Sequence, residues 1–158
     1  MNSKEKTTEI SKPALYAIAF LLSLVGGILF FTTEFGWWQG GYSWGYDFAL
    51  YGEFVEWYGK LALVLLGLLF LFVAFVSLQK LYPFLKIPDE VEDKLEKISF
   101  YAAIGVIVLT VITAILFVVQ VSDATDWDFG TTFYTGLIGG IVTVLLLWFA
   151  RRNESPAK

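Results

Sequence analysis

Four long apolar stretches constrain this chain more than any other feature of its sequence. They cover residues 13–33, 59–79, 99–121 and 130–150. Lys60, near the edge of the second stretch, is the one charged residue in them. A bilayer core about 30 Å thick needs about 20 apolar residues per helix, and lipid offers the backbone no other hydrogen-bond partner. We therefore predict an all-α membrane protein, a four-transmembrane-helix bundle. The single helical domain is expected at 13–151, between tails at 1–12 and 152–158.

Composition agrees with this prediction and narrows the chemistry. Apolar residues make up 57% of the 158 residues, whereas soluble domains hold about 45–50%. The chain has no His and no Cys. This argues against haem, iron–sulfur and structural zinc sites, and it excludes disulfides and Ser-His-Asp or Cys-His catalysis. We expect no cofactor, no nucleic-acid partner and no enzymatic activity.

Basic residues predict the orientation in the membrane. Ten of the eleven Lys and Arg residues lie near the two ends of the chain or between the second and third stretches. Only Lys60 falls on the other side. Because basic residues accumulate in cytoplasmic loops, we predict a multi-pass protein integral to the plasma membrane, with both termini in the cytoplasm.

The segment between the second and third stretches contains a helix start. Pro88 suits a first helical turn, and Asp89 and Glu90 follow where the helix dipole favours acids. The third helix should therefore begin near residue 89 and extend two or three turns into the cytoplasm. A charged extension of this kind is usually a solvated helix, and the alternative is a docking surface for a partner.

The first outer loop, residues 34–58, is rich in aromatic side chains. Tyr51, Phe54, Trp57 and Tyr58 would fall on one face of a helix, so we predict helix from about residue 46. The loop should form a short lid on the membrane surface. Five Trp residues on this side should act as interfacial anchors at headgroup level. They are Trp37, Trp38, Trp44, Trp57 and Trp127.

Carboxylates also gather on the predicted outer side. Calcium prefers several oxygen ligands, which makes a subset of these acids weak candidates for a metal site. The candidates are Asp123, Asp126, Asp128, Glu53 and Glu56. The spacing D-x-x-D-x-D lacks the Gly and the distal Glu of an EF-hand loop. The simpler interpretation is that acids keep an outer loop hydrated.

The spans contain small residues at helical spacing and no Asp, Glu, Lys or Arg in their interiors. Such small residues let helix backbones approach within lipid. They are Ala19, Ser23 and Gly27 in the first span, and Gly136 and Gly140 in the fourth. We expect these positions to close the four-helix bundle, with a dimer face as the alternative. The uncharged interiors argue against a proton-coupled pump, while a pore lined by hydroxyls or carbonyls stays open.

A larger, aromatic first outer loop, a short second one and the late G-x-x-x-G resemble the layout of the claudin-type tetraspan proteins. That family's signature is a Trp followed by Gly-Leu-Trp and two cysteines. Here Trp37-Trp38 and Trp44 are the nearest features, the loop is shorter, and the disulfide cannot form without Cys. The resemblance implies a tetraspan layout and transfers no functional residue.

These observations favour a non-enzymatic packing, scaffolding or accessory-subunit role in the bilayer. The partners would be lipid and either other membrane protein subunits or further copies of the chain. One alternative is a small channel or carrier for a neutral or lipophilic solute. A second is a cation-responsive module that uses the outer carboxylates. A lipid-modifying enzyme that uses the same carboxylates is the least favoured.

Overall fold

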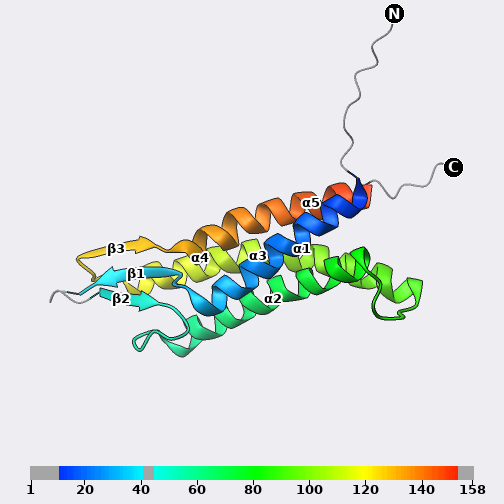
Figure 1. The fold of residues 1–158 in the computed structure, drawn as a ribbon. Helices are drawn as coiled ribbons and strands as arrows, with labels where there is room; N and C mark the ends of the chain where they lie inside the picture. Colours follow the sequence, from blue (N-terminus) through cyan, green and yellow to red (C-terminus); the bar gives the residue numbers. More distant parts are fainter. Residues whose placement is uncertain (1–10, 41–44, 153–158) are drawn as a thin grey trace, which may run out of the picture.

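The computed structural model describes residues 11–40 and 45–152. This part of the chain contains four helices long and apolar enough to cross a membrane, as predicted (Figure 1). They are α1 (Lys12–Thr32), α2 (Trp57–Leu81), α3 (Asp89–Gln120) and a fourth over Thr131–Arg152. The fourth consists of α4 (Thr131–Tyr134), a π-helical segment η1 (Thr135–Gly139) and α5 (Gly140–Arg152). The predicted tails lie almost wholly outside the described residues.

Local sequence signals set the helix ends. Pro13 occupies the first turn of α1, where its missing N–H costs nothing. Helix α3 begins at Asp89, directly after Pro88, which confirms the predicted start. Acidic residues in the first turn of α3 and the basic pair at the end of α5 both complement the helix dipole.

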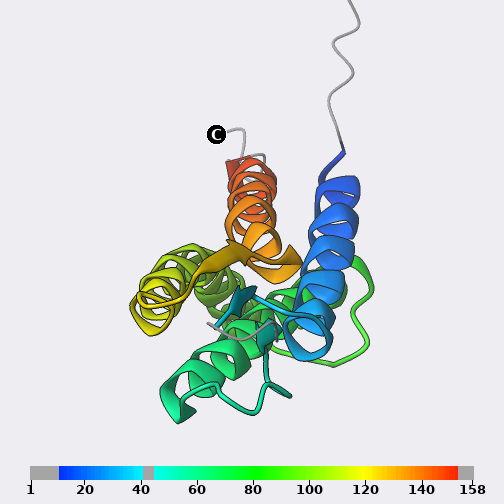
Figure 2. The same cartoon turned by 90° about the vertical axis from the view of Figure 1, so that its left-hand side faces the viewer.

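The prediction of an all-α protein is wrong for the loops at one end of the bundle. Three short strands form an antiparallel sheet in the order β2-β1-β3. They are β1 (Gly36–Gln39), β2 (Gly45–Phe48) and β3 (Asp126–Phe129). We call this the sheet end, and the end where α1 begins and α5 stops the terminal end (Figure 1). Seen from the sheet end, the strands lie in front of the helices (Figure 2).

The helix predicted from about residue 46 is also wrong, because β2 occupies 45–48 and α2 begins only at Trp57. Alternation explains the difference. Trp38 lies opposite Tyr46 on one neighbouring strand and Trp127 on the other. These rings lie on the sheet face nearer the helices, where Trp38 packs against Phe117 of α3 with centroids 6.4 Å apart. Pairing with β3, which is distant in sequence, stabilises strands whose side chains alternate between the two faces of the sheet. Helical spacing within the first loop alone cannot show this pairing.

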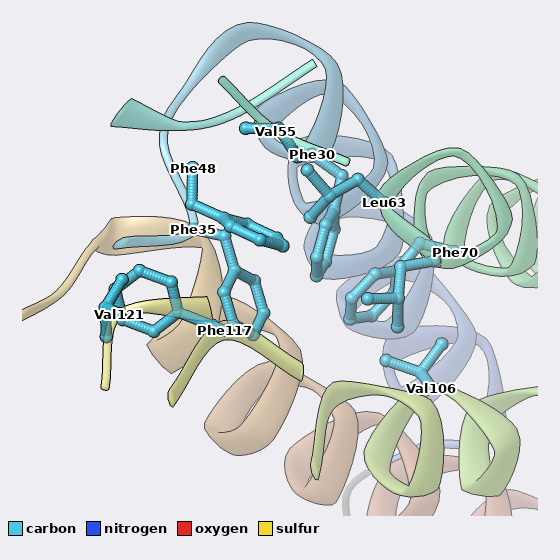
Figure 3. Packing of buried hydrophobic residues seen from close by; sticks show 10 residues of the cluster. Phe30, Phe35, Phe48, Val55, Leu63, Phe70, Val106, Phe117 and Val121 are labelled. Carbon is cyan, nitrogen blue, oxygen red and sulfur yellow. The ribbon is translucent and has the colours of Figure 1, made fainter. Parts of the chain in front are cut away.

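Two apolar clusters fill the bundle. At the sheet end, rings from the first loop meet rings from the helices, as in the edge-on pair of Phe48 and Phe117 with centroids 5.3 Å apart (Figure 3). Phe30 and Phe70 continue this packing between α1 and α2, with centroids 5.9 Å apart. The second cluster closes the terminal end. It consists of Leu15, Tyr16, Ala19, Val73, Ala103, Leu147 and Ala150.

Candidate functional site

Helix α1 packs tightly against α2 through glycines on both helices. A Cβ atom added at Gly27 would lie 2.8 Å from the side chain of Leu71. A Cβ atom added at Gly67 would lie 2.5 Å from the ring of Phe31. Each helix therefore inserts a large side chain over a glycine of the other. This is the close approach that small residues permit in lipid, where van der Waals contact drives association.

The opposite side of α1 is open. A groove of about 640 Å³ runs between α1 and the fourth helix. It is lined by Leu21, Leu22, Val25, Gly26, Leu29, Thr131, Tyr134, Thr135, Ile138, Gly139 and Val142. At 1.5 Å per residue, the stretch from Leu21 to Leu29 is about 12 Å long, or roughly two helical turns. The surface is apolar apart from the Thr and Tyr hydroxyls on α4 and η1.

The π-helical segment forms one wall of this groove. Thr135, Ile138 and Gly139 of η1 line it, while Leu137 lines a smaller hollow of about 340 Å³ against α3. A Cβ atom at Gly136 would clash with the Thr110 side chain of α3, so the glycine lets η1 approach α3 closely. Single π-helical turns occur frequently at functional sites.

Contacts close the groove at both of its ends. At the sheet end, the Thr33 and Thr132 hydroxyl oxygens lie 2.6 Å apart and join α1 to α4. The Thr132 N–H also donates to the Glu34 carbonyl at 3.2 Å. At the terminal end, the second apolar cluster brings Ala19 of α1 together with Leu147 of α5. The groove is therefore a bounded hollow on the side of the bundle.

An ionic cluster joins three helices near the terminal end. Glu96 is only 4% exposed, and its Oε2 forms an ion pair with Lys80 Nζ of α2 at 2.9 Å. Its Oε1 lies 3.8 Å from Arg151 Nε of α5. Lys80 also pairs with Glu92 at 3.2 Å. Two charged partners offset the cost of burying the Glu96 carboxylate.

The interpretation of this extension as a solvated helix is therefore wrong at Glu96, which is buried. The sequence did contain a signal, because Glu96, Ser99, Ala103 and Val106 follow one another at helical spacing and are all buried. The acid continues the inward stripe of α3 beyond the end of the apolar run. Other charged residues of the extension, such as Lys94, are exposed as predicted.

The predicted Trp anchors occupy different environments at the sheet end. Trp38 and Trp127 lie on the sheet face nearer the helices, whereas Trp37 alternates to the other face. Trp57 starts α2 and is 72% exposed. Trp44 lies outside the described residues.

The candidate metal ligands do not come together. Asp126 and Asp128 lie on β3, Asp123 precedes that strand, and Glu53 and Glu56 lie in the other loop. Within residues 11–40 and 45–152, no three acidic residues are placed to hold a metal ion.

The predicted packing residues lie inside the bundle. Ala19, Ser23 and Gly27 are all buried on α1. A Cβ atom at Gly140 would lie 2.9 Å from Ile107 of α3, so this glycine and Gly136 both face α3. Both glycines of the G-x-x-x-G therefore contact a helix of the same chain.

Comparison of the chain with protein-family models, with curated proteins and with solved structures gave no match. Function must therefore be argued from the site itself.

Proposed function

We propose that this chain is a small, non-enzymatic membrane protein that packs beside another membrane subunit and stabilises or organises it. The groove between α1 and the fourth helix is the observation that supports this role most directly. It is an apolar hollow on the side of the bundle, closed at both ends by contacts within the chain. A tetraspan accessory or scaffolding subunit needs such a preformed lateral surface.

A helix of a partner is the occupant that the groove fits best. The hollow is about two helical turns long, which matches the contact of two crossing helices. Gly139 contributes no side chain, and a Cβ atom there would find its nearest neighbour 3.8 Å away. A partner backbone could approach at this position, and Thr131 offers a hydroxyl for an interhelical hydrogen bond. Thr135 Oγ1 donates to the Thr131 carbonyl at 2.9 Å and is left to accept such a bond.

The proposal includes a location and an orientation. The bias of Lys and Arg favours the plasma membrane with both termini in the cytoplasm. The terminal end then carries Arg151, Arg152 and the ionic cluster into the cytoplasm, while the sheet end faces outward. Exposed acids on the sheet, such as Asp47 and Asp128, suit that outer position.

A channel or carrier receives less support from the packing. Phe30, Leu66 and Phe70 are fully buried in the sheet-end cluster between the helices. A solute path along the bundle axis would have to displace these side chains from a close-packed core.

Site-specific crosslinking in the native membrane tests the proposal. A photoreactive amino acid at Val25, inside the groove, should yield a stoichiometric crosslink to one membrane protein, identified by mass spectrometry. Val108 is the control, because it is also 53% exposed but lies on α3, away from the groove. Crosslinks to lipid alone from both positions would contradict the proposal. A crosslink only to a second copy would assign self-association.

Filling the groove provides an independent test. Gly139→Leu should displace the partner while leaving the fold intact. Gly105→Leu is the matched control, because a Cβ atom at Gly105 also meets nothing nearer than 3.7 Å and lies outside the groove lining. Copurification of the partner should be lost only with the Gly139 variant. Equal recovery with both variants would show that the groove does not hold the partner.

A further inference from the structure

A pocket opens beside the edge of the sheet, away from the groove. β2 and the loop that follows it border an open hollow of about 470 Å³, within the usual range of about 300–1,000 Å³ for small-molecule sites. The pocket is lined by Gly45, Tyr46, Asp47, Tyr51, Gly52, Glu53 and Phe54. These described lining residues combine three aromatic rings with two carboxylates and include no basic side chain.

Contacts with the rest of the fold hold the aromatic walls in place. The rings of Tyr46 and Phe54 meet edge to face, with centroids 4.7 Å apart and an interplanar angle of 70°. The Phe54 carbonyl accepts a hydrogen bond from Gln120 Nε2 at 2.9 Å. Because Gln120 is the last residue of α3, this bond ties the pocket loop to the bundle. The two rings thus form a fixed corner.

The floor of the pocket depends on a tight turn at Gly52. Its N–H donates to the Ala49 carbonyl at 3.0 Å. A Cβ atom at Gly52 would clash with the Asp47 carbonyl, so only glycine allows the loop to fold back this closely on β2. The turn brings Tyr51 and Glu53 beside Asp47, and residues from two segments therefore surround one hollow.

Negative charge dominates the surroundings of the pocket. Partial burial, followed by the charges of Asp47 and Glu34, raises the pKa of the Tyr51 phenol. The carboxylates of Asp47 and Glu53 are exposed and belong to the lining. Lys60 is the only basic residue between residues 33 and 79, and it does not line the pocket.

We propose that this pocket binds an organic ammonium group, with a quaternary or methylated ammonium as the best fit. The face of an aromatic ring attracts a weakly hydrated cation, and rings with nearby carboxylates form the cages that recognise choline-like groups. Tyr46, Tyr51 and Phe54 supply the rings, and Asp47 and Glu53 supply the charge. This inference is independent of the groove and its partner.

A hard metal ion suits the pocket less well than an organic cation does. Calcium takes about six to eight oxygen ligands, whereas this lining offers two carboxylates and otherwise mainly rings. Aromatic faces can replace the hydration of a methylated ammonium but not that of calcium. The two carboxylates and the aromatic walls together therefore favour an organic cation.

Two sources could supply this ammonium group. Trp57 and Tyr58 are exposed at the start of α2, directly after the pocket loop, and such aromatic residues settle at headgroup depth. A choline headgroup of a neighbouring lipid would then lie at the level of the pocket. A free organic cation outside the membrane has the same chemistry.

Saturation-transfer NMR with choline tests the site. In maltoside detergent, which contains no ammonium group, the full chain should transfer saturation to the N-methyl protons of choline. The neutral carbon analogue, in which a tert-butyl group replaces trimethylammonium, should receive much less. Equal transfer to choline and to the analogue, or none to choline, would overturn the proposal.

Substitutions at exposed lining residues locate the binding. Tyr51→Leu, Phe54→Leu and Glu53→Gln should each weaken choline binding by about two- to five-fold, the size expected for one exposed cation–π or charge contact. Trp57→Leu and Glu56→Gln are the matched controls, because both residues are exposed and neither lines the pocket. Equal weakening by the controls would show nonspecific attraction to the acidic surface and would overturn the proposal.

Nanodiscs distinguish the two sources. In phosphatidylglycerol discs, free choline should bind as it does in detergent. In discs of phosphatidylcholine with a deuterated headgroup, loss of the free-choline signal would assign the lipid headgroup as ligand. Retention of the signal would assign a free cation.

Discussion

On the side of α1 that faces α2, Leu71 covers Gly27 and Phe31 covers Gly67, whereas on the side that faces η1 and α5 a groove of about 640 Å³ stays open. Both sides are apolar, and both contain glycine. What differs is that Leu71 of α2 fills the space at Gly27, whereas the fourth helix leaves the groove unfilled. Gly26, the α1 glycine in the groove lining, meets Phe70 of α2. A stripe of small residues on a helix therefore indicates that another helix packs closely there, but it does not identify which helix.

The two sides of α1 should also differ in role, one in the stability of the fold and the other in binding. The α1–α2 contact is complete within the chain, so changes there should affect folding. The open side leaves its apolar surface to the membrane or to a partner, and contacts at its two ends keep it in shape. Substitutions on the two sides should therefore differ in their effect on the free energy of unfolding.

Gly67→Leu should damage the closed side most. Its Cβ atom alone would lie 2.5 Å from the Phe31 ring, and we expect unfolding to become easier by about 3 kcal/mol, the upper part of the range for overpacked cores. Reversible unfolding in mixed micelles with a rising fraction of dodecyl sulfate measures this change in the free energy of unfolding. Gly139→Leu, the same exchange on the open side, should change stability by less than about 0.5 kcal/mol. Equal losses would remove the distinction between the two sides.

Glu96→Gln should loosen the terminal end of the open side. Arg151 then loses its carboxylate partner while Lys80 keeps Glu92. We expect a loss of about 2 kcal/mol, below the roughly 3–5 kcal/mol typical when one partner of a buried pair is removed. Glu92→Gln, at a more exposed pair, should cost less than half as much in the same unfolding titration. The reverse order would show that Glu96 does not anchor the cluster.

Gly136→Ala tests the junction of η1 with α3. The added methyl group would clash with Thr110, so we expect a loss of about 1–2 kcal/mol from overpacking. Thr110→Ala should recover part of that loss in the double variant, because it removes the clashing atoms. Strictly additive losses would show that the two residues do not meet.

Thr132→Val should have the smallest effect, at the sheet end of the open side. Thr33 Oγ1 donates to the Leu29 carbonyl at 3.0 Å, so the Thr132 hydroxyl is left to donate to Thr33. Removing this bond should cost about 0.6 kcal/mol, the average for interhelical hydrogen bonds in a membrane bundle. Thr131→Val, at an exposed hydroxyl in the groove, should leave the unfolding free energy unchanged. A larger loss at Thr131 would contradict this assignment of the contact.

The sequence alone determined the features that depend on neighbours along the chain. Uncharged runs of about 20 residues specify helices that can cross a membrane, since no other backbone conformation satisfies its own hydrogen bonds there. Pro88 and Asp89 specified the start of α3 because capping acts over a single turn. The absence of His and Cys limited the chemistry before any fold was known.

How distant segments meet depends on the packing of the whole chain. β1 pairs with β3 from the far end of the chain, and the loop therefore became a sheet rather than a helix. Glu96 is buried because Lys80 and Arg151 reach it from two other helices. The groove arises in the same way, between helices distant in sequence. The aromatic pocket lies within residues 45–54, and its long-range support is the bond from Gln120 of α3 to the Phe54 carbonyl. Local sequence fixes backbone conformation through short-range contacts, whereas burial and cavities depend on which surfaces the whole chain brings together.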